Sequence, residues 1–189
     1  NSDYPDDMTT HVRDPKILKD GEKYIMVLGA RSIEDKGFAL VYHSTDLSHW
    51  HYVTRIQTSE KFGFMWECPD LFKLGNQLIL SVSPQGLEKE EARYQNVFQS
   101  GYFLVDENHG DYTVRRFEEF DYGFDFYAVQ TFEDESGRRI LMAWMGLPME
   151  SEYQEDPTVK YNWRHALTMP RELVFQNGAV YQRPLKEFE

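Results

Sequence analysis

The chain has 189 residues, enough for one domain with a sizeable core, and its 41% hydrophobic and 28% charged residues indicate a globular protein rather than a disordered one. The formal net charge of −12 argues against nucleic acid as a partner, because an acidic surface repels phosphate backbones. No apolar run approaches the roughly 20 residues that a membrane helix needs, which argues against a membrane partner. The single cysteine, Cys68, excludes an internal disulfide and a zinc site built from several cysteines.

Short runs rich in Tyr, Val, Ile and Phe follow one another along the chain, and turn signals separate them. The strongest turn signal is Asn177-Gly178, because both residues tolerate the positive φ of a type I′ turn. The segment 87–93 is short and highly charged, which favours a loop over a helix. The pattern therefore predicts an all-β fold. The expected strands are 23–30, 37–44, 50–57, 77–82, 97–104, 112–116, 126–132, 139–144, 172–175 and 179–182.

A repeat runs through these strands. Residues 13–18 (RDPKIL) resemble residues 67–72 (ECPDLF), and residues 126–132 (FYAVQTF) form a third copy without the proline. Asp14 and Cys68 are 54 residues apart, and Cys68 and Tyr127 are 59 apart. A period of this size with about four strands per copy predicts blades of a β-propeller, here 12–60, 64–118 and 123–184, with a β-sandwich as the alternative. Because the first strand of each blade lies beside the central axis, polar residues at its start should converge on one funnel.

Two acidic residues in the repeat are candidates for chemistry. Pro15 biases Asp14 toward extended geometry, and the neighbouring Arg13 could keep its carboxylate ionised, although an ordinary surface pair is the alternative. Glu67 follows Trp66, and desolvation by large apolar neighbours would raise its pKa toward that of a general acid. The alternative is that Glu67 points to solvent while Trp66 packs.

Aromatic residues surround a third carboxylate. Asp125 lies in the segment 123–128 (GFDFYA), and an aromatic face beside a carboxylate is typical of sugar sites. Trp144 could form a second aromatic wall, although a single Trp is more often a core residue. Cys68 is interpreted as a small buried hydrophobe rather than a nucleophile. The six scattered histidines offer no metal-binding spacing, so neither a metal nor another cofactor is expected.

Together these segments resemble glycoside hydrolase family 32, the family of invertases, sucrose-6-phosphate hydrolases and other β-fructofuranosidases. The stretches 11–16 (HVRDPK), 66–70 (WECPD) and 123–128 (GFDFYA) look like the family's three motifs, and 167–173 (LTMPREL) is similar to the stretch that closes its propeller. The resemblance implies a five-bladed propeller, usually followed by a β-sandwich. It also implies retaining hydrolysis of β-fructofuranosides through a covalent fructosyl-enzyme intermediate.

The resemblance assigns roles to individual residues. Glu67 would be the general acid/base, and Asp14 would hold fructose hydroxyls and stabilise the transition state. The partner would be a small sugar: sucrose, sucrose 6-phosphate or a fructan. The implied substrate-binding residues are Arg13, Trp66, Asp125, Tyr127 and Trp144.

One part of the family pattern is missing. The nucleophile of the family is an aspartate in a Trp-Met-Asn-Asp-Pro-Asn-Gly-like motif, and the acidic residues before Arg13, which are Asp3, Asp6 and Asp7, lack that context. We therefore expect blades 3 to 5 here, with the first blades and the β-sandwich absent and the missing blades as partners. Retaining chemistry needs two carboxyl groups, so the chain alone should be inactive while its parent protein is active.

Finer features point to a subgroup. The segment 83–86 (SPQG), followed by 94–96 (YQN), is most similar to bacterial intracellular sucrose and sucrose-6-phosphate enzymes, which implies a cytoplasmic protein. The loop 150–162 could shape the pocket. No phosphate site is identified, because Lys89, Arg93 and Arg164 are best interpreted as solvated loop charges. Two other functions stay open: an inverting arabinosidase or xylosidase on a related five-bladed propeller, and a non-catalytic sugar-binding propeller.

Overall fold

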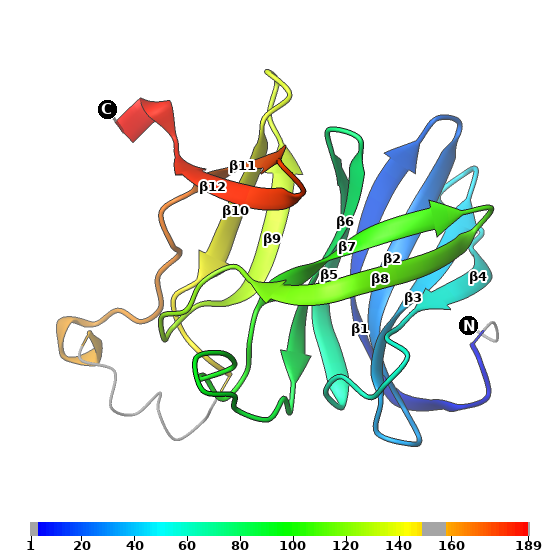
Figure 1. Ribbon diagram of the computed structural model, residues 1–189, viewed down its shortest axis with the longest axis horizontal. Helices are drawn as coiled ribbons and strands as arrows, with labels where there is room; N and C mark the ends of the chain where they lie inside the picture. Colours follow the sequence, from blue (N-terminus) through cyan, green and yellow to red (C-terminus); the bar gives the residue numbers. More distant parts are fainter. Residues whose placement is uncertain (1–3, 149–157, 189) are drawn as a thin grey trace.

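The computed structural model describes residues 4–148 and 158–188, and it is built from three four-stranded antiparallel sheets (Figure 1). The first sheet contains β1 (Met8–Asp20), β2 (Lys23–Ser32), β3 (Gly37–Ser44) and β4 (His51–Ile56). The second contains β5 (Met65–Leu74), β6 (Gln77–Gln85), β7 (Gly101–Asn108) and β8 (Asp111–Glu119). The third contains β9 (Tyr127–Glu133), β10 (Arg139–Trp144), β11 (Arg171–Gln176) and β12 (Ala179–Pro184), and the short 3-10 helices are η2 (Val159–Tyr161) and η3 (Lys186–Phe188).

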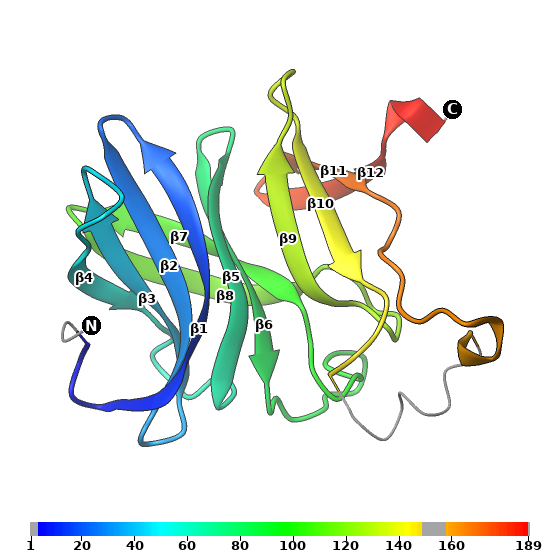
Figure 2. The same ribbon diagram turned by 180° about the vertical axis from the view of Figure 1, so that it is seen from behind.

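The three sheets stand side by side, each with its strands in chain order. Figure 2 shows β1 beside β5, with β6 between β5 and β9 in this view. Among the first strands of the sheets, β5 contacts both β1 and β9. The all-β prediction is confirmed, and no helix among the described residues is long and apolar enough to cross a membrane. Residues 150–157 of the predicted pocket loop lie outside the described residues.

Some predicted strand bounds are wrong. β7 begins at Gly101 instead of residue 97, because the preceding residues make other contacts: Phe98 forms an isolated bridge with Gln85, and Gln99 N–H donates to the Pro84 carbonyl. The list of expected strands also lacks β1 and β5, although the repeat implied the first strand of a blade there. Polar residues interrupt the apolar alternation in both strands. The expected loop 87–93 contains no helix.

The first strand of each sheet, β1, β5 or β9, is called its inner strand below. Each inner strand is interrupted by a β-bulge. The pairing register shifts between Arg13 and Lys16 in β1 and between Glu67 and Asp70 in β5. A bulge adds one residue to one strand, so that residues three apart, rather than two, face the same side. Arg13 and Lys16 therefore share one face of β1, and Glu67 and Asp70 share the equivalent face of β5.

The third copy of the repeat has the same bulge, which corrects its alignment. The shift in β9 falls after Tyr127, and the bulged residue Ala128 has a φ of 54°, as Cys68 has a φ of 49° and Asp14 a φ of 61°. Cys68 thus corresponds to Ala128, 60 residues later, and not to Tyr127 as the sequence comparison paired them. Tyr127 is instead the counterpart of Glu67.

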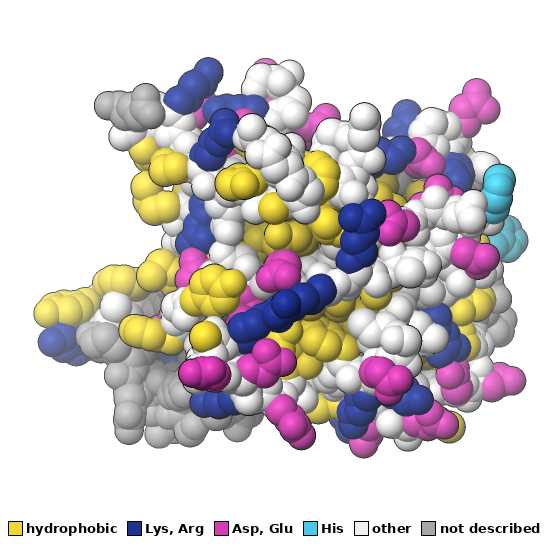
Figure 3. All heavy atoms as spheres, viewed as in Figure 1, with side chains coloured by type: hydrophobic (Ala, Val, Ile, Leu, Met, Phe, Trp, Pro, Cys, Tyr) yellow, Lys and Arg dark blue, Asp and Glu magenta, His cyan; other side chains and the backbone are white. Residues whose placement is uncertain are grey.

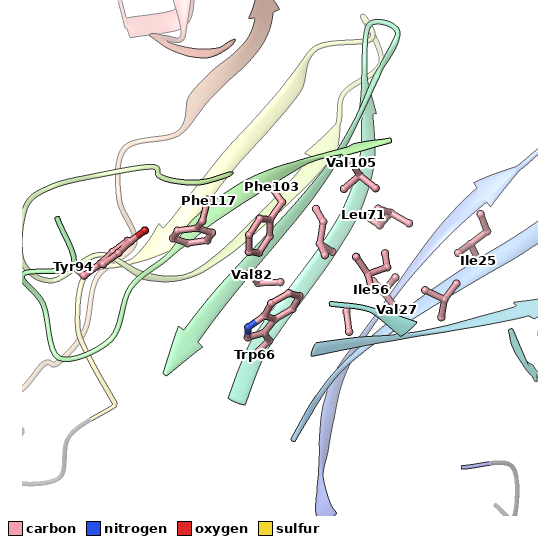
Figure 4. Packing of buried hydrophobic residues seen from close by; sticks show 13 residues of the cluster. Ile25, Val27, Ile56, Trp66, Leu71, Val82, Tyr94, Phe103, Val105 and Phe117 are labelled. Atoms are coloured by element: carbon pink, nitrogen blue, oxygen red, sulfur yellow. The ribbon is translucent and has the colours of Figure 1, made fainter. Parts of the chain in front are cut away.

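Hydrophobic side chains fill the space between the sheets. One cluster joins the first two sheets, with Val27 and Ile56 from the first and Trp66, Phe103 and Phe117 from the second (Figure 4). A second cluster joins the second and third sheets. These clusters fix how the sheets sit against each other, and so they fix where the ends of β1, β5 and β9 meet.

Candidate active site

Glu67 lies where the three inner strands meet, and its side chain is only 15% exposed. Arg13 of β1 reaches Glu67 Oε1 with Nε at 2.8 Å and Nη2 at 2.7 Å. The Tyr127 hydroxyl of β9 donates to Oε2 at 2.6 Å, and the Gln85 amide at the end of β6 donates to the same oxygen at 2.8 Å. The carboxylate is therefore held from all three sheets in one orientation.

The equivalent bulges explain this convergence. Arg13, Glu67 and Tyr127 each stand immediately before the residue with positive φ in their strand. The three side chains therefore leave their strands at the same level and on the same side. The predicted convergence of polar residues from the three strands is thus present in the structure, since Arg13 and Tyr127 both contact Glu67.

Asp14 and Cys68 join the two bulges of β1 and β5. The Asp14 carboxylate accepts a hydrogen bond from the Cys68 backbone N–H at 2.9 Å. Burial, together with the negative charges of Asp14 and Glu67, raises the pKa of the Cys68 thiol to about 12. The thiol is therefore protonated near neutral pH, as expected for a packing residue rather than a nucleophile.

Tyr127 is 2% exposed, and its hydroxyl has more than one partner. Burial and the nearby charge of Glu67 raise the pKa of Tyr127, so the phenol stays protonated and remains a donor. The Ser83 carbonyl lies 3.5 Å from the hydroxyl as a second acceptor. Gln85 Nε2 also donates to the Tyr127 hydroxyl oxygen at 3.4 Å, which links Tyr127 to β6.

Gln85 is a site residue that the sequence analysis did not assign. The signal for it lies in the hairpin around Gly75-Asn76, because antiparallel pairing across that turn brings the end of β6 back beside the start of β5. The structure pairs Glu67 with Ser83 and Met65 with Gln85. A bulge in β5 shifts the pairing, so the turn alone does not give the register.

Trp66 was predicted to bind substrate, and this prediction is wrong. The side chain is fully buried, its ring lies 5.1 Å from that of Phe103, and its indole N–H donates to the Phe62 carbonyl at 2.8 Å (Figure 4). Successive residues of a strand point to opposite faces. Since Glu67 faces the site, Trp66 has to face the core between the first two sheets.

Asp125 and Trp144 lie at the same end of the third sheet as Tyr127. Asp125 is exposed, has a φ of 60°, and stands two residues before Tyr127. Trp144 pairs with Tyr127 across β9 and β10, is half-buried, and meets the His165 ring edge-on at 5.3 Å. Their roles as sugar contacts stay predictions.

A separate cavity of about 370 Å³ opens between the segment 58–62 and β8. Arg93, Tyr94 and Arg115 are among the residues that line it, whereas Glu67 is not. The Arg93 guanidinium donates to the Phe117 carbonyl through Nη2 and lies 4.7 Å from the centre of the Tyr94 ring, whereas its buried Nε has no hydrogen-bond partner among the described residues. On the face of the molecule that carries β8, acidic and basic side chains are interspersed (Figure 3).

Comparison with known proteins identifies relatives of this chain. The glycosyl hydrolases family 32 N-terminal domain matches residues 2–184. Sucrose-6-phosphate hydrolases of Bacillus subtilis and Staphylococcus xylosus are each 44% identical over 98% of this chain. The chain spans 40% and 37% of the length of these two relatives.

Solved structures give the same result. The sucrose-6-phosphate hydrolase of Lactobacillus gasseri superposes with a TM-score of 0.84 at 32% identity, and the match covers 97% of this chain and 38% of that one. A Bombyx mori β-fructofuranosidase superposes with a TM-score of 0.83 at 34% identity, and the match covers 97% of this chain and 39% of that one. The chain belongs to glycoside hydrolase family 32.

Proposed function

We propose that the full-length protein hydrolyses terminal β-D-fructofuranosides, with sucrose 6-phosphate or sucrose as substrate and with retention through a fructosyl-enzyme intermediate. The observation that carries the proposal is the carboxylate of Glu67, held at the meeting point of three inner strands by Arg13, Gln85 and Tyr127. Relatives named as sucrose-6-phosphate hydrolases support the choice of substrate.

In this mechanism Glu67 acts first as an acid and then as a base. It protonates the glycosidic oxygen as the glucose part of the substrate leaves, and it later takes a proton from the water that attacks the fructosyl-enzyme intermediate and releases fructose. When Glu67 holds its proton on Oε2, the Tyr127 hydroxyl accepts that proton as a hydrogen bond and turns its own hydrogen toward the Ser83 carbonyl. Tyr127 thus satisfies both protonation states of Glu67.

Formation of the fructosyl-enzyme intermediate needs a second carboxyl group, the nucleophile, roughly 5–5.5 Å from the first. Asp14 is held by the Cys68 N–H beside Glu67, and we assign it to the fructose hydroxyls and the positive charge of the transition state. We assign the nucleophile to a part of the protein beyond this chain. Residues 1–189 alone should therefore release no fructose.

We further propose that the three sheets are blades 3 to 5 of a five-bladed propeller. The support is the order of the motifs and the match to about 40% of each relative's length. We also propose a cytoplasmic location, for which the single cysteine and the similarity to intracellular enzymes speak.

An inverting glycosidase is the second candidate, because a thermostable family-43 glycoside hydrolase superposes with a TM-score of 0.53 at 14% identity, which shows a shared fold. NMR of the first-formed anomer separates the two. Retention supports the proposal, whereas inversion contradicts it.

Fructose release by the full-length protein, wild type against Glu67→Gln, tests the proposal. Glutamine keeps the shape of the side chain but cannot donate the acid's proton, so the rate should fall at least ~10²-fold on both sugars. The faster of sucrose and sucrose 6-phosphate names the substrate. An unchanged rate in the variant would show that Glu67 is not the acid/base.

A further inference from the structure

Asp70 is a buried carboxylate that the mechanism above does not use. Its side chain is 1% exposed, although it belongs to an acidic residue in the middle of a strand. A buried charge is costly unless charged or hydrogen-bonding partners surround it. The partners of Asp70 are therefore informative about why a carboxylate stands there.

Those partners come from both neighbouring sheets. Asp70 Oδ2 accepts hydrogen bonds from the backbone N–H and the hydroxyl of Thr131 in β9, each at 2.8 Å. The Lys16 ammonium of β1 lies 3.4 Å from the same oxygen. Lys16 in turn donates to the Thr131 carbonyl at 2.8 Å and to the Gln130 side chain at 3.1 Å. Three inner strands are thus joined by one closed set of polar contacts.

This set lies directly beyond the candidate active site. Asp70 follows Glu67 by three residues with the bulge between them, so both side chains face the same side of β5. Lys16 has the same relation to Arg13 in β1. The polar set therefore fixes the spacing of the same three strands that bring Arg13, Glu67 and Tyr127 together.

We propose that Asp70 is a positioning residue for the reaction. It locks β5 to β1 and β9 one layer below the site, and this lock holds Glu67 within hydrogen-bond distance of Arg13 and Tyr127. The proposal rests on the proposed function of Glu67 as acid/base. Asp70 itself touches neither the sugar nor the proton that moves.

Two substitutions in the full-length protein separate the hydrogen bonds from the charge. Asp70→Ala removes every contact, and we expect kcat for sucrose or sucrose 6-phosphate to fall at least ~10-fold, since a displacement of about 1 Å can cost 10²-fold. KM should stay within about threefold, because the sugar contacts are intact. Asp70→Asn keeps a carbonyl oxygen for both Thr131 donors and should retain most of kcat. A folded Asp70→Ala protein with wild-type kcat would overturn the proposal.

A milder variant and a matched control cover the case in which Asp70→Ala does not fold. Thr131→Val keeps the shape but loses one donor to Asp70, and kcat should fall several-fold at constant KM. Asp20→Ala breaks an exposed ion pair with Lys73, 3.3 Å long, between the same strands β1 and β5 at their far ends. Its kcat should be unchanged, and an equal loss in both variants would contradict a specific lock.

Crystal structures provide a readout that does not depend on activity. In Asp70→Ala, or in Thr131→Val if the first does not fold, the Tyr127 hydroxyl should move away from Glu67 Oε2, beyond the 2.6 Å of the wild type. An unchanged contact would overturn the lock. If the wild type releases no fructose, the proposed function fails, whereas the distances still decide about the lock.

Discussion

The two faces of β5 differ although they are built from adjacent residues. Glu67 faces polar donors from three sheets, and Trp66 is fully buried among aromatic rings of the core. Both belong to one short motif, WECPD at 66–70. Membership of a motif therefore does not assign a role, because strand geometry sends neighbouring side chains to opposite faces.

The largest expected effect is a loss of stability when the core face of β5 is altered. Trp66→Ala removes a fully buried ring and its hydrogen bond to Phe62, and the free energy of unfolding of the full-length protein should fall by about 3–5 kcal/mol. Denaturant unfolding measures this. Because the Trp66 side chain faces the core and not the site, the protein that is still folded should keep its kcat. A loss of kcat without a loss of stability would show that Trp66 acts in the site.

The second prediction concerns Cys68, the bulge residue of β5. A pKa of about 12 leaves little thiolate on Cys68 at pH 8, so iodoacetamide should modify the folded protein at least ~100-fold more slowly than the unfolded chain. Mass spectrometry follows the reaction. The rate should rise with pH up to about 12, and fast modification at pH 8 would contradict the protonated thiol.

Tyr127→Phe tests how much the polar face depends on the hydrogen bond from Tyr127 to Glu67. The substitution removes one hydrogen bond to a charged group, which is worth about 1.5–3 kcal/mol, and leaves the ring in place. We expect kcat to fall about 10- to 100-fold with a small change in thermal stability. A variant with full activity would show that Arg13 and Gln85 suffice to hold Glu67.

The smallest expected effect sets the baseline for both faces. Asp106 and Arg115 form an exposed ion pair of 2.8 Å between β7 and β8. Asp106→Asn should leave the urea midpoint of unfolding essentially unchanged, because solvent screens exposed pairs. Urea unfolding at low and high salt measures this. A clear fall in the urea midpoint would show that exposed ion pairs contribute to the stability of the sheets.

Much of the fold could be predicted from the sequence. The three copies of the repeat, the all-β class and the convergence of polar residues from the first strands all follow from spacing and turn signals. The alignment of Ala128 with Cys68 did not follow, because the third copy lacks the proline that marks the bulge in the other two. The backbone conformation, not the residue type, reveals that equivalence.

The sequence indicated Asp14 and Glu67 as candidate carboxylates, whose roles stay predictions, but it did not indicate Gln85 or Asp70. Gln85 reaches Glu67 from a neighbouring strand whose register depends on a bulge, and Asp70 looks like an ordinary strand residue until its contacts with Thr131 are known. Such contacts join residues that are 18 and 61 positions apart in the chain. The turn at Gly75-Asn76 indicates that Gln85 returns beside β5 without giving the register, and no local pattern indicates the contact between Asp70 and Thr131.

The most direct test of the central claim compares two leaving groups in the full-length protein carrying Glu67→Ala. An acid is needed to expel the glucose part of sucrose, whereas a nitrophenolate leaves without protonation. The value of kcat/KM, which reports fructosyl transfer, should fall at least ~10²-fold for sucrose and only slightly for nitrophenyl β-fructofuranoside. Equal losses for both substrates would contradict the role of Glu67 as the acid.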